Sequence, residues 1–167
     1  SIQVGAAALA GFNKYYLVAM KNWFDTQRRN CSIRYPFDII HIHHYNNTTE
    51  AGQSTDWNKK ALPPELSNFQ EKLVDFKVFA TKYFPGKKLY LGETGYDSNS
   101  QSPQGAVTIG EYLSEEVQGF WILRSYLFFL AAKWDKFFLY SLGDHASENS
   151  SEQYATSGIV KRFIWDN

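Results

Sequence analysis

The sequence predicts an α/β fold in which parallel strands alternate with helices, and three observations support this prediction. Short apolar stretches that read as strands recur four times along the 167 residues. Segments with the three-to-four-residue apolar spacing of a helix separate them. The strand segments are apolar on both faces, and crossovers of this length favour parallel pairing with helices outside the sheet, either in a doubly wound sheet or in half of a (β/α)₈ barrel.

The first predicted unit runs from a strand over residues 2–9, IQVGAAAL, into a helix over residues 14–29. Asn13 precedes this helix, and its side chain can accept a hydrogen bond from a free backbone N–H of the first turn. The second strand is predicted over residues 36–45, PFDIIHIHHY, because this stretch is rich in isoleucine and begins with Pro36.

A second helix is predicted after a polar loop that extends to about Leu62. Pro63 and Pro64 are expected to open it, because a proline in the first turn loses no needed hydrogen bond. An apolar face follows at spacings of three and four residues. It consists of Leu66, Phe69, Leu73, Phe76 and Ala80. Gly86 is expected to end the helix, since glycine readily adopts a left-handed conformation.

The third strand is predicted over residues 88–93, KLYLGE, and a long loop follows it. Ser114, with two glutamates directly after it, predicts the start of a helix that continues over residues 115–134. Because this segment is apolar on most sides, we expect it to be well buried. The fourth strand is predicted over residues 136–144, KFFLYSLGD.

The composition argues against several classes of function. Seventeen basic residues balance seventeen acidic ones, so we expect neither nucleic acid nor a membrane as a partner. Cys31 is the only cysteine, which leaves no disulfide framework and no cysteine-based zinc site. No apolar run approaches the roughly 20 residues that span a bilayer. No glycine-rich nucleotide-binding motif follows a strand, and we expect no cofactor.

Polar side chains collect where the predicted strands end. With a period of two, His41, His43 and Tyr45 share one face of the second strand, while His44 and Asn46 share the other. Sites in α/β folds form at the carboxyl ends of strands. The ends of the second, third and fourth strands therefore point to one rim.

Glu93 ends the third strand among small residues, and the same period places it on the face of Leu89 and Leu91. Tyr140 lies on the fourth strand, and Asp144 ends it. A carboxylate at a strand end can be catalytic, but it can equally cap a helix or form an ion pair in a loop.

Other polar residues have alternatives of their own. His43 and His44 are adjacent on a strand and so point to opposite faces, and no metal-binding spacing is present, so we expect no metal site. His41, deeper in the strand, is expected to be a satisfied core histidine. Trp57 is either a platform for stacking sugars or a plug for its loop. Asp97 either supports the loop after Glu93 or, as we favour, caps a turn.

Three segments resemble the carboxyl-terminal half of clan A glycoside hydrolases, in particular bacterial, polysaccharide-directed members. They are KKLYLGETGYDSNSQSPQ, SEEVQGFWILRSYL and FFLYSLGD, and with the HHY strand the likeness covers residues 36–145. That clan has a (β/α)₈ barrel and hydrolyses glycosidic bonds with retention of configuration. The resemblance implies that residues 1–167 are a single half-barrel fragment, with the predicted strands as strands five to eight.

The resemblance also assigns roles to residues at the rim. Glu93 matches the clan's nucleophile, the glutamate that ends strand seven. His43 and Tyr45 match, by position, the histidine and tyrosine near the end of strand six that orient the nucleophile. Candidate substrate-binding residues at the same rim are Trp57, Asn46, Tyr96, Tyr140 and Asp144.

Nothing in the chain corresponds to strands one to four, and strand four carries the clan's acid/base glutamate. Retaining hydrolysis needs two carboxyl groups about 5–5.5 Å apart, so the chain alone is expected to be inactive. A non-catalytic carbohydrate-binding or assembly module is the alternative. Open strand edges predict self-association or pairing with the missing amino-terminal half. By resemblance, the compartment would be extracellular or periplasmic.

Overall fold

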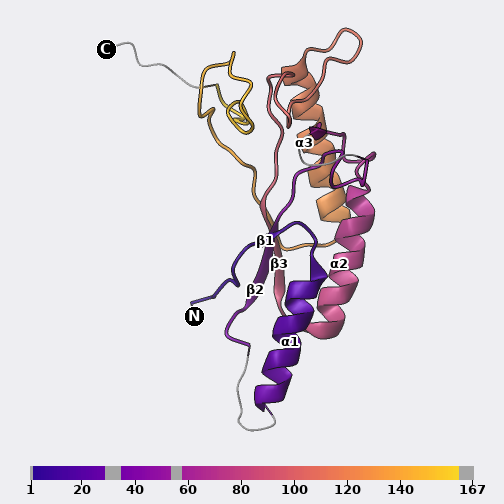
Figure 1. Ribbon diagram of the computed structural model, residues 1–167, viewed down its shortest axis with the longest axis vertical. Helices are drawn as coiled ribbons and strands as arrows, with labels where there is room; N and C mark the ends of the chain where they lie inside the picture. Colours follow the sequence, from indigo (N-terminus) through magenta and orange to yellow (C-terminus); the bar gives the residue numbers. More distant parts are fainter. Residues whose placement is uncertain (1, 29–34, 54–57, 162–167) are drawn as a thin grey trace, which may run out of the picture.

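The computed structural model describes residues 2–28, 35–53 and 58–161. Its four strands form one sheet in the order β1-β2-β3-β4, and every neighbouring pair is parallel. Helices connect consecutive strands, which confirms the predicted α/β fold (Figure 1). In chain order the elements are β1 (Leu9–Ala10), α1 (Lys14–Arg28), β2 (Ile39–His43), α2 (Phe69–Tyr83), β3 (Lys88–Glu93), α3 (Ser114–Ala131) and β4 (Lys136–Phe137).

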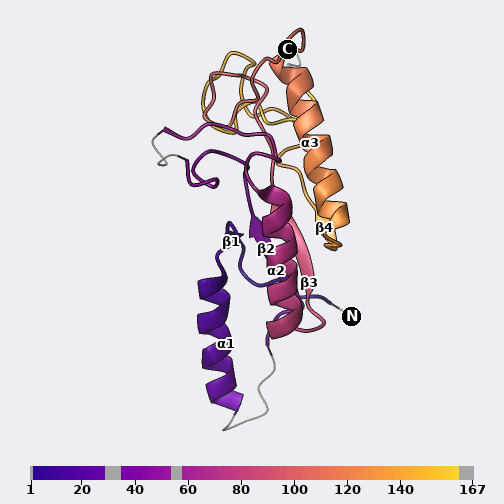
Figure 2. The same cartoon turned by 90° about the vertical axis from the view of Figure 1, so that its right-hand side faces the viewer.

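All three helices lie on the same face of the sheet, as two perpendicular views show (Figures 1 and 2). The main core fills the space between helices and sheet. It joins Leu17 of α1, Phe76 of α2 and Phe129 of α3 to Ile42 of β2 and Leu91 of β3. Because these side chains come from five elements, the core ties the strand–helix units into one packed body.

The opposite face of the sheet is covered by no helix of the described residues. We call it the open face. Five residues of β2, of β3 and of the position just beyond β2 lie on it, and all are half-buried: Ile39, His41, His43, Tyr45 and Tyr90. The alternation of β2 is as predicted, since the residues between these positions are buried. The sheet thus has one packed face and one accessible face.

A second, smaller core fixes the loops beyond the carboxyl ends of the strands. Tyr96 and Ala106 from the loop after β3 pack with Trp121 of α3 and with Ala61 from the loop after β2. The Tyr96 and Trp121 rings meet edge to face, with centroids 5.1 Å apart. These contacts hold the loops in place around the rim.

The helix ends follow the predictions in part. Asn13 accepts a hydrogen bond of 3.0 Å from the backbone N–H of Tyr15, as expected for the cap of α1. Gly86, beyond α2, has the expected positive φ of 79°. However, α2 begins at Phe69 and not at the prolines, because Asn68 adopts a left-handed conformation with φ of 56°.

The two edge strands are shorter than predicted. Before β1, only an isolated bridge from Gly5 to Ile39 continues the pairing. Residues 5–8 of this segment are one glycine and three alanines, which lack the branched side chains that pack well on a pleated surface. β4 is limited to residues 136–137, although the backbone N–H of Phe138 still donates a 2.9 Å hydrogen bond to Leu91.

The prediction that α3 is well buried is wrong. Five large apolar side chains of this helix are more than two-fifths exposed. They are Phe120, Leu123, Tyr126, Leu127 and Leu130. The other side of α3, with Trp121 and Phe129, packs into the two cores. An apolar helix segment needs neighbours on every side to be buried, and the described residues supply them on one side only.

Candidate functional site

A bulge at the end of β3 decides which way Glu93 points. Ile42 pairs with Leu91, but the next residue of β2, His43, pairs with Glu93, so Gly92 is an extra residue on β3. Because side chains alternate along a strand, this extra residue moves Glu93 to the open face. The prediction that Glu93 shares the face of the strand's leucines is wrong: both leucines are buried, whereas Glu93 is half-buried beside His43.

The glycine at the bulge leaves space for the side chains next to it. A Cβ atom at Gly92 would lie 2.7 Å from Nδ1 of His41 and 3.2 Å from Cδ2 of His43. Those two rings pack edge to face, with centroids 5.7 Å apart. Glycine therefore leaves the room in which the ring of His43 can lie beside Glu93.

One carboxylate oxygen of Glu93 has two neighbours from the end of β2. The hydroxyl of Tyr45 donates a hydrogen bond of 3.1 Å to Oε2. Nδ1 of His43 lies 3.3 Å from the same oxygen. Within the described residues, Oε1 accepts no hydrogen bond, and 34% of the side chain is exposed. The carboxylate is thus oriented through one oxygen, while the side chain as a whole remains partly exposed.

The environment of Tyr45 makes its hydroxyl a permanent donor. Burial raises the pKa of Tyr45 far above its ordinary value, and the negative charge of Glu93 raises this pKa further. The ring of Tyr154 packs against Tyr45, with centroids 4.6 Å apart. Burial also raises the pKa of Tyr154, to about 12. Both phenols therefore keep their protons throughout the physiological pH range.

These residues line a pocket of about 300 Å³ at the rim of the sheet. This volume is at the lower end of the range for small-molecule sites. The pocket combines two phenol rings, two carboxylates and one ammonium group. Its lining comprises Ala10, Gly11, His43, Tyr45, Asn47, Thr49, Glu50, Lys59, Glu93 and Tyr154. Flat rings beside polar groups suit a ligand that has both apolar faces and hydroxyl groups.

Tyr154 is the aromatic residue of the pocket that the sequence reasoning missed, along with the polar residues Asn47, Thr49, Glu50 and Lys59. It lies in the polar loop after the fourth strand, where no periodicity marks it. Its backbone N–H donates a hydrogen bond of 2.8 Å to Oδ2 of Asp97, which also accepts one from the hydroxyl of Ser102. Asp97 is fully buried, and burial raises the pKa of its carboxyl group. Asp97 therefore supports two loops, which is the alternative to the turn cap that the sequence analysis favoured.

Asn46 and Tyr96, predicted to bind substrate, lie beneath the pocket with exposed fractions of 0% and 1%. The amide nitrogen of Asn46 donates to the hydroxyl of Tyr96 at 2.8 Å, and its oxygen accepts from the hydroxyl of Ser67 at 2.7 Å. The Tyr96 hydroxyl in turn donates to the carbonyl of Leu62 at 3.0 Å. Side chains without exposed surface cannot touch a ligand, so their expected role is corrected to support of the rim.

The three histidines of residues 41–44 lie on the predicted faces, but their burial differs from the prediction. His41, expected in the core, is half-buried on the open face. His44 is the core histidine: its ring stacks on Phe69 and lies 3.2 Å from Oδ1 of Asn46. Burial lowers the pKa of His44 to about 3, with a further contribution from the charge of Lys72. His44 is therefore neutral at physiological pH.

The remaining predicted binding residues do not line the pocket. Tyr140 is half-buried, and its ring meets the edge of Tyr154 with centroids 6.0 Å apart. Oδ1 of Asp144 accepts a hydrogen bond of 2.9 Å from the backbone N–H of Gly158, and its side chain lines a separate polar hollow. Trp57 lies outside the described residues.

The described ranges contain no candidate metal site, since no group of three or more histidine, cysteine, aspartate or glutamate side chains there could hold a metal ion. No helix there is both long and apolar enough to cross a bilayer. The chain matches no protein-family model and no curated protein sequence.

Proposed function

We propose that this chain is part of a retaining glycoside hydrolase that acts on an oligo- or polysaccharide, with Glu93 as the nucleophile. Tyr45 and His43 orient Glu93 in this proposal. The four strands would be strands five to eight of a (β/α)₈ barrel. The acid/base glutamate would come from outside this chain.

The observation that carries the proposal is the arrangement of Glu93 at the mouth of the sheet. A carboxylate at the carboxyl end of a parallel strand occupies the position where α/β folds place their sites. Its Oε2 is held by Tyr45 and lies next to His43, while Oε1 has no hydrogen-bond partner among the described residues. A nucleophile needs this combination of fixed orientation and an oxygen that no hydrogen bond occupies.

The chemistry then follows the two-step course of retaining hydrolysis. Oε1 of Glu93 attacks the anomeric carbon as the glycosidic bond breaks, which forms a covalent glycosyl-enzyme. A second carboxyl group donates its proton to the leaving oxygen and later removes a proton from the water that releases the sugar. The hydrogen bond from Tyr45 holds the attacking group in line throughout.

Glu50 is the other carboxylate in the pocket, and we do not assign it the acid/base role. Its Oε2 lies 3.5 Å from Nζ of Lys72 and 3.6 Å from Nδ1 of His44. Lys72 also donates a hydrogen bond of 2.6 Å to the Glu50 carbonyl. These contacts tie Glu50 to the wall of the pocket, whereas a proton donor has to reach the leaving group.

The walls of the pocket support a sugar as ligand. The rings of Tyr45 and Tyr154 offer apolar surface, and Asn47, Thr49 and Lys59 add hydrogen-bonding groups. Tyr154 takes the substrate-binding role that was expected of Tyr96. Since the pocket holds both acidic and basic groups, it shows no strong preference for a charged sugar.

The alternative function is a non-catalytic carbohydrate-binding or assembly module on the same scaffold. The feature that favours it is that the other carboxylate of the pocket, Glu50, is held by Lys72 and His44, while retention requires a second carboxyl group that can reach the leaving oxygen. In this alternative, Glu93 would accept hydrogen bonds from sugar hydroxyls and no covalent intermediate would form.

The test is release of reducing ends from a panel of polysaccharides by the longer protein that the proposal requires. Glu93→Gln preserves size and removes the nucleophile, so activity should fall at least about 10³-fold. Glu50→Gln is the matched control, because it changes a second carboxylate of the same pocket and should retain most activity. Comparable losses in both variants would argue against Glu93 as the sole nucleophile.

If no polysaccharide in the panel is cleaved, calorimetry with the same glycans separates the two functions. Binding that persists in Glu93→Gln but is lost in Tyr154→Ala would favour the binding module. Neither cleavage nor binding would contradict both.

The open face and the outer edges of β1 and β4 support a partner that completes the sheet. In the hydrolase proposal this partner is the amino-terminal half of the barrel. When that half is absent, a second copy of the chain would pair with the free strand edges in its place. Light scattering of the isolated chain should therefore show association. A monodisperse monomer would contradict this part of the proposal.

A further inference from the structure

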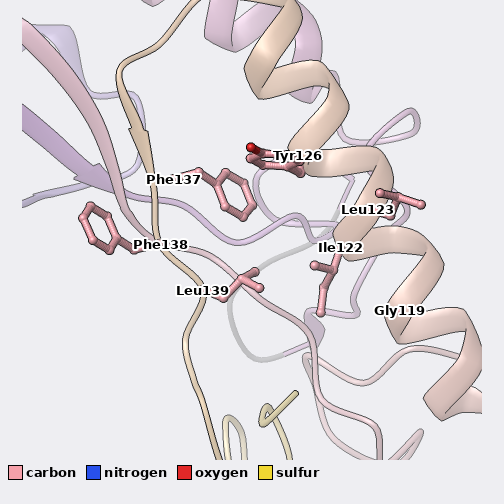
Figure 3. Close-up of a pocket in the computed structure, with 7 residues that line it drawn as sticks. All are labelled: Gly119, Ile122, Leu123, Tyr126, Phe137, Phe138 and Leu139. Atoms are coloured by element: carbon pink, nitrogen blue, oxygen red, sulfur yellow. The ribbon is translucent and has the colours of Figure 1, made fainter. Parts of the chain in front are cut away.

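Two parts of the surface carry groups of aromatic rings. One is an apolar hollow of about 460 Å³ between α3 and residues 137–139, and its lining includes Leu123, Tyr126 and Phe137 (Figure 3). Among the described residues that line it, only Tyr126 has a polar side-chain atom. The hollow therefore offers little to the hydroxyl groups of a sugar. The other is a row of rings that starts in the pocket around Glu93 and leads out of it.

The row links the pocket to the loop after β4 through three ring contacts. The rings of Tyr45 and Tyr154, which line the pocket, have centroids 4.6 Å apart. Tyr154 and Tyr140 meet edge to face, with centroids 6.0 Å apart. Tyr140 stacks on His145 with an interplanar angle of 26° and centroids 5.2 Å apart. Tyr154 and Tyr140 are half-buried and His145 is exposed, so the outer end of the row is the more accessible one.

The loop that carries Tyr154 keeps its ring on the accessible side. The three residues that follow are small or polar, yet they are the buried ones: Ala155, Thr156 and Ser157. Tyr154 itself has a φ of 70°, a left-handed conformation that is uncommon for residues other than glycine. The hydrogen bond from its backbone N–H to Asp97 holds it there. Local strain of this kind persists where the surrounding structure enforces it, and it concentrates at functional sites.

The outer end of the row is fixed as well. Oγ of Ser141 donates a hydrogen bond of 2.8 Å to the carbonyl of Gly143 and uses its only proton there. It therefore accepts the 3.0 Å hydrogen bond that joins it to Nε2 of His145. The backbone N–H of His145 donates to the carbonyl of Ala155 at 2.9 Å. An exposed ring that is already held in place loses little conformational freedom when a ligand stacks on it.

The size of the pocket indicates that a sugar chain has to continue outside it. Its volume of about 300 Å³ is at the lower end of the range for small-molecule sites. The row offers flat apolar surface next to the pocket, and Tyr140 and Tyr154 add hydroxyl groups to that surface. A sugar unit presents the matching combination of an apolar ring face and hydroxyl groups.

We propose that Tyr140 and His145 form a second sugar-binding position, and that the sugar chain runs from the Glu93 pocket across Tyr154 to this pair. The inference rests on the proposed function, because it takes a sugar as the occupant of the pocket. It adds the direction in which the chain leaves the pocket and the residue whose ring carries the outer unit, His145.

The test compares ligands of increasing length on the longer protein that the proposed function requires. The probes are glucan, mannan, xylan and chitin oligomers, each from disaccharide to hexasaccharide. Calorimetry in a Glu93→Gln background measures their affinity without cleavage, and this affinity should rise with length in at least one series. His145→Ala should lower the ratio of hexasaccharide to disaccharide affinity about three- to tenfold, the range expected for one ring contact.

Two further variants separate the ring surface from structural support. His145→Phe keeps a ring but loses the hydrogen bond to Ser141, and it should preserve most of the ratio. Tyr112→Ala removes a ring that is 45% exposed in the loop before α3 and lies outside the row. This control should leave the ratio at the value of the background protein.

Three results would overturn the inference: no binding or no dependence on length in every series, an equal loss at all lengths in His145→Ala, or a ratio that His145→Ala leaves unchanged. Cleavage is measured separately, with Glu93 restored. Hydrolysis together with a ratio that does not depend on His145 would remove the second position and leave the hydrolase proposal standing. A ratio that depends on His145 without any hydrolysis would support the second position and contradict the hydrolase.

Discussion

The two faces of the sheet are built from alternate residues of the same strands, yet they serve different purposes. On β2, Ile40 and Ile42 pack against the helices and are almost completely buried. Between them, His41 and then His43 remain half-buried on the open face. The helix-covered face therefore stabilises the fold, while the open face presents the groups that can do chemistry.

The same division continues past the end of the strand. Asn46 is buried in a hydrogen-bonded network beneath the rim, whereas Tyr45, one residue earlier, donates to Glu93 in the pocket. A change on the helix side should therefore reduce stability, and a change on the open side should reduce activity. Four substitutions test this comparison, in order of decreasing expected effect.

Asn46→Ala should have the largest effect on stability. It removes the partner of Tyr96 and Ser67 and leaves buried polar groups unsatisfied, which should cost about 2–4 kcal/mol. Asn47→Ala is the matched control, because Asn47 makes a single described side-chain hydrogen bond, to the backbone N–H of Glu50. Denaturant unfolding measures both. A stable Asn46→Ala variant that has lost only ligand affinity would restore the predicted binding role of Asn46.

His44 should make stability depend on pH. Its pKa is lowered from 6.5 to about 3 in the folded state, so between these values the unfolded chain binds the proton and the folded chain does not. Stability is then highest above pH 6.5 and falls as the pH is lowered, by up to about 1.4 kcal/mol per unit. Unfolding at a series of pH values, in wild type and His44→Gln, isolates this contribution. An unchanged slope in the variant would contradict it.

Tyr45→Phe should reduce hydrolysis by the longer protein about 10- to 100-fold, the equivalent of one hydrogen bond to a charged group. Its stability should change little, because the ring and its packing on Tyr154 remain. Tyr90→Phe is the matched control, since Tyr90 lies on the same face but makes no described contact with Glu93. Equal effects of the two changes would mean that the Tyr45 hydroxyl does not position Glu93.

Gly92→Ala should have the smallest effect on stability and a clear effect on the site. The added methyl group meets the rings of His41 and His43, which are half-buried and can move at a cost of about 1 kcal/mol. The movement takes His43 away from Glu93. NMR of the histidine side chains should show a shifted His43 signal together with a nearly unchanged unfolding free energy. A large loss of stability would show that the bulge belongs to the core.

The sequence predicted what local spacing controls. The alternation of β2 follows from a period of two, and the cap at Asn13 follows from the preference of asparagine for that position. The face of Glu93 could not be predicted in this way, since one extra residue at Gly92 reverses the alternation and leaves no mark in the pattern.

Long-range contacts account for the other differences. Tyr154 reaches the pocket because the buried carboxylate of Asp97, 57 residues earlier, holds its backbone. The exposed side of α3 depends on which segments lie next to it and not on its own apolar residues. Such contacts join distant parts of the chain, so neither propensity nor periodicity reveals them.

The most direct test of the central claim is covalent trapping of the nucleophile. The longer protein is incubated with a panel of 2-fluoro-glycosides, which form a slowly hydrolysed glycosyl-enzyme with retaining hydrolases, and the labelled peptide is identified by mass spectrometry. The proposal predicts a label on Glu93 that Glu93→Gln abolishes. A label on a different carboxylate, or hydrolysis of a polysaccharide without any label on Glu93, would contradict it.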